Sequence, residues 1–239
     1  MVVSLELAKP ELAKDFRPVF VSFIKNNLSD CGEEFFQEFY KDRDSIAKKF
    51  TFGVRMNHPK FVGDTIQLGG NLISLTLSSA DAKEMMLLYN AMIKNKKKTF
   101  PLKNQNHMQM KSIRLLPEQK VHKNEFVIKM LSPMVLREHN RETNIDRYVD
   151  CTCDDFAETA KKIVQAQLSI FAMDENLVHG FTIVPVIPKK TVVTAFDYHI
   201  DVSLGVYKLT GQPELLNFLY HAGIGSRRSQ GFGMFEILA

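Results

Sequence analysis

The chain has 239 residues, of which 45% are hydrophobic and 24% are charged, and its formal net charge is +4. This hydrophobic content is sufficient for one large domain or two ordinary ones, and it excludes a disordered chain. The mild positive charge suits an anionic partner, and no apolar run approaches the roughly 20 residues that span a bilayer.

The first half of the sequence alternates between strand and helix patterns. Runs in which apolar and polar side chains alternate predict strands, whereas apolar residues three and four positions apart predict helices. In chain order we expect a strand at residues 2–7, helices at 18–28 and 33–40, strands at 50–56 and 65–77, a helix at 80–95 and a strand at 102–116. Ser79 is the expected N-cap of the third helix, and Gly69-Gly70-Asn71 has the composition of a hairpin turn.

The second half follows a similar order. We expect a strand at residues 125–130, a helix at 155–171, strands at 182–186 and 190–208, a helix at 213–221 and a last strand at 234–239. The run at 190–208 is long enough to bend or to form a hairpin. Each half therefore approximates β-α-β-β-α-β, which is the order of the ferredoxin-like fold and of RNA-recognition domains. We predict an α+β protein of two tandem ferredoxin-like (RRM-like) domains, over residues 1–119 and 120–239.

A glycine-rich run separates the last helix from the last strand. Its sequence over residues 223–233 is GIGSRRSQGFG, in which two glycine pairs flank a Ser-Arg-Arg-Ser core. Glycine permits positive φ and the close approach of a ligand, and arginine can bind phosphate through two hydrogen bonds. The run has neither the third glycine of a dinucleotide fingerprint nor the pattern of a Walker loop. It predicts a loop that holds a phosphate backbone, and the alternative is a flexible connection before a strand.

The three cysteines indicate neither a disulfide framework nor a zinc site. Cys151 and Cys153 are too close together for a structural zinc pair, and no second pair completes one. We therefore expect reduced thiols, a cytoplasmic location, no metal and no cofactor.

The order of elements and the glycine-rich run together point to a known family. A tandem ferredoxin-like chain whose last helix leads into G-x-G-x₅-G-x-G resembles the CRISPR repeat-processing endoribonucleases of the RAMP superfamily. Two more stretches are similar to that family: residues 126–135, where Ser132-Pro133 follows an apolar run, and the first strand with its helix at 18–28. The resemblance implies a metal-independent ribonuclease that binds CRISPR repeat RNA and cuts precursor CRISPR RNA once per repeat. The 2′-hydroxyl attacks its own phosphate and leaves a 2′,3′-cyclic phosphate and a 5′-hydroxyl.

The chain departs from the family in its catalytic side chains. Family members often carry a histidine after the first helix, beside a tyrosine and a lysine, but residues 1–57 contain no histidine. When the sequence is matched to the family pattern, Lys25 falls where the tyrosine often lies and Tyr40 where the histidine lies. Lys48 or Lys49 falls at the position of the lysine. The resemblance thus implies a catalytic site of Lys25, Tyr40 and Lys48.

Each of these three side chains has a chemical role and an ordinary structural alternative. A tyrosine or a lysine can protonate the 5′-oxygen, and lysines stabilise the charged phosphorane. Because the reference pKa of a phenol is about 10, we expect Lys41 and Lys48 to lower the pKa of Tyr40 by favouring the phenolate. In the alternative, Lys25 lies on a solvated helix face, Tyr40 caps an aromatic core cluster, and Lys48 is a surface charge.

The expected RNA contacts lie in and around the glycine-rich loop. Within the loop they are Gly223, Gly225, Ser226, Arg227, Arg228, Ser229, Gly231 and Gly233. The backbone N–H groups of residues 225–231 can add an anion nest. His221 precedes the loop and could contact RNA or supply the missing imidazole. The resemblance also implies Lys129 and Arg137, which lie around the strand that opens the second domain.

A second function stays open from the sequence. A catalytically inactive RAMP-type RNA-binding subunit of a CRISPR effector complex would share the same glycine-rich loop. In both cases the expected partner is CRISPR repeat RNA, no membrane partner is expected, and the protein is a monomer or a homodimer.

Overall fold

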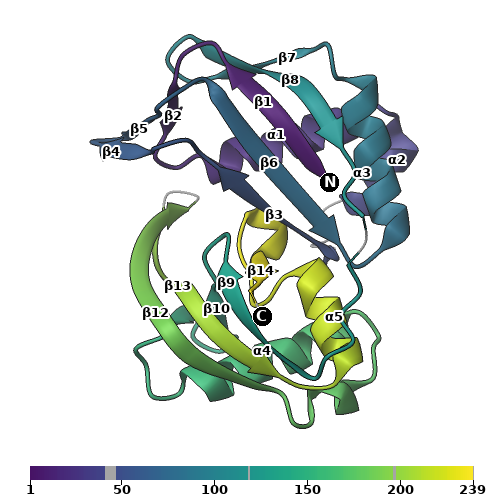
Figure 1. Cartoon of the computed structure of the whole chain (residues 1–239), viewed down its shortest axis with the longest axis vertical. Coiled ribbons are helices and arrows are strands. Elements are labelled where there is room, and N and C mark those ends of the chain that lie inside the picture. Colours follow the sequence, from purple (N-terminus) through teal and green to yellow (C-terminus); the bar gives the residue numbers. More distant parts are fainter. Residues whose placement is uncertain (41–46, 118, 196–197, 239) are drawn as a thin grey trace.

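The protein consists of two halves that each contain an antiparallel sheet (Figure 1). The computed structural model describes residues 1–40, 47–117, 119–195 and 198–238. The first half contains β1 (Val2–Leu7), β2 (Glu11–Ala13), α1 (Arg17–Ser29), α2 (Glu33–Phe39), β3 (Phe50–Arg55), β4 (Lys60–Val62), β5 (Thr65–Gln67), β6 (Leu72–Ser79), α3 (Ala82–Lys94), β7 (Thr99–Leu102) and β8 (Asn106–Arg114). The second half contains β9 (Glu125–Met130), β10 (Leu136–Asn140), β11 (Ile145–Val149), α4 (Phe156–Ile170), η1 (Glu175–Val178), β12 (Thr182–Ala195), β13 (Tyr198–Thr210), α5 (Pro213–Ala222), η2 (Arg228–Gln230) and β14 (Phe235–Ile237).

Both main sheets have the strand order of the ferredoxin-like fold. The order is β3-β6-β1-β8-β7 in the first sheet and β12-β13-β9-β14 in the second. In each sheet the first strand of the β-α-β-β-α-β unit lies between the third and the fourth, and β7 adds one edge strand to the first sheet. The predicted fold class, two tandem ferredoxin-like domains, is confirmed. The predicted boundary after residue 119 falls between β8 and β9 and stays a prediction.

The spacing of the buried side chains matches the strand and helix periods that the sequence indicates. β1 buries every second side chain in the first core, as a strand with one face toward the core does. α4 buries a stripe at every fourth residue in the second core: Phe156, Ala160, Val164 and Leu168. Within the described ranges, no helix combines the length and the hydrophobicity that crossing a membrane requires.

The turn at Gly69-Gly70-Asn71 is not a hairpin, contrary to the prediction. β5, before the turn, pairs with β2 and β4 in a separate three-stranded sheet. β6, after the turn, pairs with β1 and β3 of the first main sheet. Strands of two different sheets thus share one alternating run, and periodicity alone cannot separate them.

Two other expected boundaries also differ. Asp81 is the N-cap of α3 in place of Ser79, and its side chain accepts hydrogen bonds from the N–H groups of Lys83 and Glu84 at 2.9 and 3.2 Å. The strand expected at 102–116 corresponds to β8, and β7, which pairs with β8, lies almost entirely before that range. The run at 190–208 is divided between β12 and β13, which pair as the hairpin that its length allowed. The β10-β11 hairpin was not predicted.

Candidate active site

Two lysines from different segments converge on the ring of Tyr40. Lys25 lies on α1, Tyr40 follows α2, and Lys48 precedes β3. The ammonium nitrogen of Lys25 is 4.6 Å from the centroid of the Tyr40 ring, and that of Lys48 is 4.4 Å from it. At this distance the ring quadrupole attracts a cation. The structure therefore brings together the three side chains that the resemblance implies as catalytic, and their catalytic role stays a prediction.

An aromatic cluster holds the ring of Tyr40 in this position. The ring stacks on Phe36, with 5.1 Å between centroids, and lies 6.4 Å from Phe39. Phe39 is buried and packs edge-on against Phe50 of β3 at 6.0 Å. Tyr40 thus joins the aromatic core, as the structural alternative expected, and it also carries the two lysines. The side chain of Phe35 lies outside the described part of this cluster.

The protonation of Tyr40 differs from the expectation. Burial raises the pKa of Tyr40 above its ordinary value, and the nearby charge of Glu84 raises it further. Burial is the larger of the two causes. It raises the pKa because it penalises the phenolate, which is the charged form of the side chain. The expected lowering of this pKa by Lys48 is therefore wrong, and Lys41 falls outside the residues that the structure describes. Tyr40 stays a phenol that can donate a hydrogen bond or a proton.

The ammonium of Lys48 is shifted toward the neutral form. Burial lowers its pKa, the charge of Lys25 lowers it further, and Glu84 raises it. Lys48 therefore releases its proton more readily than an exposed lysine does, which suits a general acid. In the described parts of the chain, no group of three or more His, Cys, Asp or Glu side chains is placed to hold a metal ion.

A second aromatic ring joins cations from the two halves. Phe171 follows α4 in the second half, and the guanidinium carbon of Arg228 lies 5.2 Å from its ring centroid. The ammonium of Lys49, from the first half, lies 5.8 Å from the same centroid and 3.5 Å from the Asp81 carboxylate. Burial lowers the pKa of Arg228 to about 10, so the guanidinium stays charged at neutral pH. Arg228, which is a predicted RNA contact, and Lys49, which is adjacent to Lys48, thus contact the same ring.

The four glycines of the loop are packed against protein atoms. All four have positive φ, from 76° at Gly233 to 90° at Gly225. A Cβ atom on Gly233 would lie 2.1 Å from the carbonyl oxygen of Ile224, and one on Gly225 would lie 2.5 Å from that of Val135. A Cβ atom on Gly231 would lie 2.7 Å from the ring of Phe52 on β3. The space that the sequence left for a ligand beside these glycines is therefore occupied by the protein itself.

Part of the expected anion nest is already hydrogen-bonded. The N–H of Ser226 donates to the carbonyl of Val135 at 2.7 Å. The N–H of Gly231 donates to the carbonyl of Arg228 at 3.1 Å. The N–H of Gln230 likewise donates to the carbonyl of Arg227 at 2.8 Å. These N–H groups are therefore not part of the expected anion nest, and the nest at the other residues of 225–231 stays a prediction.

Side chains of the first half hold the backbone of the loop. The hydroxyl of Thr51 on β3 donates to the carbonyl of Phe232 at 2.8 Å. The Nε of Arg17 on α1 donates to the carbonyl of Gly231 at 3.3 Å. The Arg17 guanidinium lies between two rings, 4.8 Å from the centroid of Phe16 and 4.5 Å from that of Phe232. The loop thus joins the two halves beside α1, the helix that carries Lys25.

Three of the predicted RNA contacts bond to other side chains of the protein. The closest contacts are Tyr148 Oη at 2.8 Å from Arg227 Nη2, Glu236 Oε1 at 3.6 Å from Lys129 Nζ and Asp146 Oδ2 at 3.2 Å from Arg137 Nη1. The two ion pairs are substantially exposed, and such pairs contribute little to stability, so an RNA phosphate can compete for these cations. Their RNA-binding role stays a prediction.

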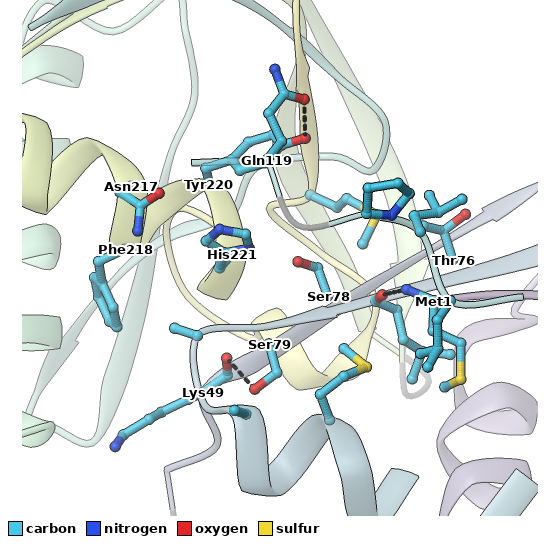
Figure 2. Close-up of a pocket in the computed structure, with 18 of the residues that line it drawn as sticks. Met1, Lys49, Thr76, Ser78, Ser79, Gln119, Asn217, Phe218, Tyr220 and His221 are labelled. Atoms are coloured by element: carbon cyan, nitrogen blue, oxygen red, sulfur yellow. Dashed lines mark hydrogen bonds between the residues drawn. The ribbon is translucent and has the colours of Figure 1, made fainter. Parts of the chain in front are cut away.

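A cavity of about 1010 Å³ lies between the two halves, and His221 lines it. Figure 2 shows His221 and Asn217 of α5 on one side and Ser78 and Ser79 of β6 on the other. Lys49 lines the cavity together with Ser79, so this space adjoins the ring that Lys49 shares with Arg228. His221 therefore lies in the interface between the halves, and the structure gives it no place on the Tyr40 ring.

The sequence of the second half identifies the family. The model for the C-terminal part of CRISPR-associated protein Cas6 matches residues 116–237, which is more than half of the chain. The chain belongs to the Cas6 family. The resemblance that the glycine-rich loop suggested is confirmed for this Cas6 chain. None of the curated proteins compared matches the sequence.

Solved structures with the same fold cover the whole Cas6 chain. An RAMP protein binding different RNA substrates matches with a TM-score of 0.83 and 22% identity, over 100% of this chain and 98% of that one. A Cas6-related protein from Pyrococcus furiosus matches with a TM-score of 0.83 and 20% identity over the same shares. A Thermus thermophilus Cas6 in a product complex matches with a TM-score of 0.70 and 13% identity over 99% of each chain. These TM-scores show a common fold.

A role for Glu84 in this site was not predicted from the sequence of the Cas6 chain. The charge of Glu84 adds to the raised pKa of Tyr40, and it partly offsets the lowering of the pKa that burial causes at Lys48 and Arg228. One signal was present, because Asp81 and Glu84 have the three-residue spacing of an N-cap and the acidic residue that often accompanies it. That spacing predicts the start of α3, but the neighbours of Glu84 come from other segments, and spacing cannot show them.

Proposed function

We propose that this Cas6 family member is an endoribonuclease that binds CRISPR repeat RNA and cleaves precursor CRISPR RNA within each repeat without a metal ion. The observation that carries the proposal is the pair of lysine ammonium groups on the Tyr40 ring. In the proposed reaction, the 2′-hydroxyl gives its proton to solvent water and attacks the adjacent phosphate, so that the P–O2′ bond forms as the P–O5′ bond breaks. The products carry a 2′,3′-cyclic phosphate and a 5′-hydroxyl.

The proposed roles follow from charge and protonation. Lys25 and Lys48 place two positive charges where they can stabilise the negative charge that develops on the phosphorane. Lys48, whose pKa burial lowers, donates a proton to the departing 5′-oxygen. Tyr40, whose pKa burial raises, donates a hydrogen bond from its phenol and keeps the two ammonium groups in place.

The proposed RNA path leads from this cluster across the glycine-rich loop. Arg228 and Lys49 on the Phe171 ring would bind a neighbouring backbone phosphate, and Arg227, Ser226, Ser229, His221, Lys129 and Arg137 are the further proposed contacts. Gly223, Gly225, Gly231 and Gly233 act by shaping the loop that carries the arginines. The similar RAMP protein that binds RNA substrates and the Cas6 product complex support an RNA ligand.

A cleavage assay tests this proposal directly. End-labelled repeat RNA is incubated with the protein in EDTA, and the ends of the products are identified by phosphatase and kinase treatment. We expect one cut per repeat, with a cyclic phosphate or its 3′-phosphate on one product and a 5′-hydroxyl on the other. Tight binding with no defined cut at any pH would contradict the enzyme and favour the inactive RNA-binding subunit.

A further inference from the structure

The carboxylate of Glu84 is held at both of its oxygens. Glu84 lies in the first turn of α3, where its Oε2 accepts a hydrogen bond from the hydroxyl of Ser79 at 3.0 Å. Its Oε1 accepts one from the backbone N–H of Lys49 at 3.3 Å. The hydroxyl oxygen of Ser79 also lies 3.2 Å from the carbonyl oxygen of Lys49, which is the alternative acceptor of its single proton. Because both oxygens accept from protein groups, Glu84 is placed to hold its neighbours and not to act as a free base.

The bond to Lys49 fixes the segment that carries Lys48. Lys48 is the adjacent residue, and its ammonium must reach over the Tyr40 ring at 4.4 Å. The side chains of residues 48 and 49 contact two different rings, Tyr40 and Phe171. A backbone anchor at this point therefore sets the position of both cations.

Titratable groups from several elements interact with Glu84. They are Tyr40 after α2, Lys48 and Lys49 before β3, Asp81 on the turn before α3, and Arg228 in η2. Lys25 on α1 contacts the ring of Tyr40. Lys49 is paired with Asp81 at 3.5 Å, and Lys83 of the same helix turn is paired with Glu38 of α2 at 2.6 Å. With Asp81 engaged by Lys49, Glu84 is the carboxylate whose charge acts on Lys48 and Arg228.

We propose that Glu84 is a positioning residue for the cleavage reaction: it anchors the Lys48-Lys49 backbone and supplies the negative charge that balances Lys48 and Arg228 across the two halves. The kinetic part of this inference rests on the proposed function. The placement of Lys48 relative to Glu84 does not, and it can be measured without RNA.

The kinetic test compares two changes at the same position. Glu84→Gln keeps an oxygen that accepts from the Lys49 N–H, places an amide donor opposite the Ser79 hydroxyl, which can accept from it, and removes the charge. Glu84→Asp keeps the charge but shortens the reach. Loss of the charge makes Lys48 release its proton more easily. We expect the single-turnover rate of Glu84→Gln, relative to wild type, to fall at least about threefold more at alkaline pH than at weakly acidic pH. Glu84→Asp should lose rate by a similar factor at every pH.

A matched control removes a charge from a pair nearby. Glu38→Gln breaks the exposed pair with Lys83 and should leave both the rate and its pH dependence unchanged. A Glu84→Gln rate that is reduced by the same factor at every pH would overturn the electrostatic role, because a purely structural change gives that result.

A second measurement separates this inference from the proposed function. Lysines are reductively methylated with ¹³C-formaldehyde, and the Lys48 signal, assigned with Lys48→Arg, is titrated by NMR in the RNA-free protein. We expect the signal to titrate at lower pH in Glu84→Gln than in wild type. Superimposed titration curves would overturn the inference, even if the protein cleaves RNA. If the wild type does not cleave RNA, displaced curves would still support the charge balance, and the proposed function alone would fail.

Discussion

The ring of Tyr40, which carries the phenolic hydroxyl, packs on an aromatic cluster and contacts two ammonium groups. Because burial raises its pKa, this hydroxyl keeps its proton and acts as a donor. Tyr40→Phe keeps the ring on which the lysines pack and removes the donor. We expect the single-turnover cleavage rate to fall about 100-fold while RNA affinity stays within about twofold. The exposed Tyr198→Phe is the control and should cleave at the wild-type rate, whereas equal rates for both variants would refute the donor role.

The charge of Lys48 sets the expected pH dependence of the site. A lysine is charged below its pKa, and burial beside Lys25 lowers this pKa. The cleavage rate should therefore decline as pH rises, and it should do so at lower pH than an ordinary lysine would cause. Lys48→Arg carries a charge that does not titrate in this range and should abolish the alkaline decline. Rates measured from about pH 6 to about pH 10 check this, with Lys111→Arg as the control. An unchanged decline in Lys48→Arg would assign it to another group.

The residues of this site could be predicted from the sequence, but their protonation could not. The family pattern indicated Lys25, Tyr40 and Lys48, and the structure brings these three side chains together. The direction of the Tyr40 pKa depends on burial among Phe36 and Phe39 and on Glu84, which is 44 positions away in the chain. Burial and distant charges are properties of tertiary structure, so the sequence favoured the wrong direction.

Only glycine fits the closest contacts of the glycine-rich loop, so we expect substitutions at these positions to destabilise the protein. Gly233 has φ of 76°, and a Cβ atom there would lie 2.1 Å from the carbonyl oxygen of Ile224. Gly63 also has positive φ, at 55°, but a Cβ atom there would meet nothing within 4 Å. We expect Gly233→Ala to lower the free energy of unfolding by more than about 2 kcal/mol and Gly63→Ala by about 1 kcal/mol.

Urea unfolding of the two variants measures this difference. Gly63→Ala carries the backbone strain alone, so the excess loss in Gly233→Ala reports the close contact with Ile224. Equal losses in the two variants would mean that the loop can shift to accept a side chain. Glycine composition predicted positive φ in this loop, but the identity of the packed atoms depends on how the chain folds back on itself.

The short strands were the elements that the sequence predicted least well. β2, β4 and β5 have three residues each, which is too short for a period to show. The long amphipathic helix α4 and strand β9 were predicted almost to their ends because several buried residues repeat at a fixed spacing. Element length therefore decided most of these outcomes, and the three-residue β14, which falls within the strand expected at 234–239, is an exception.

At the scale of the whole molecule, the cluster of Lys25, Tyr40 and Lys48 and the glycine-rich loop belong to different halves. Arg17 and Thr51 of the first half hold the backbone of residues 231 and 232 in the second half. Lys49 and Arg228, one from each half, meet on the Phe171 ring. The order of elements predicted the two ferredoxin-like units, but these contacts between them join residues about 120 to 214 positions apart, and no local pattern encodes them.

The central claim is that the two ammonium groups on Tyr40 promote RNA cleavage. The most direct measurement is the single-turnover cleavage of labelled repeat RNA in EDTA by wild type and by the double variant Lys25→Met and Lys48→Met. We predict that the double variant loses at least about 100-fold in rate while it binds the repeat with an affinity within about tenfold of wild type. Cleavage by the double variant at the wild-type rate would contradict the account.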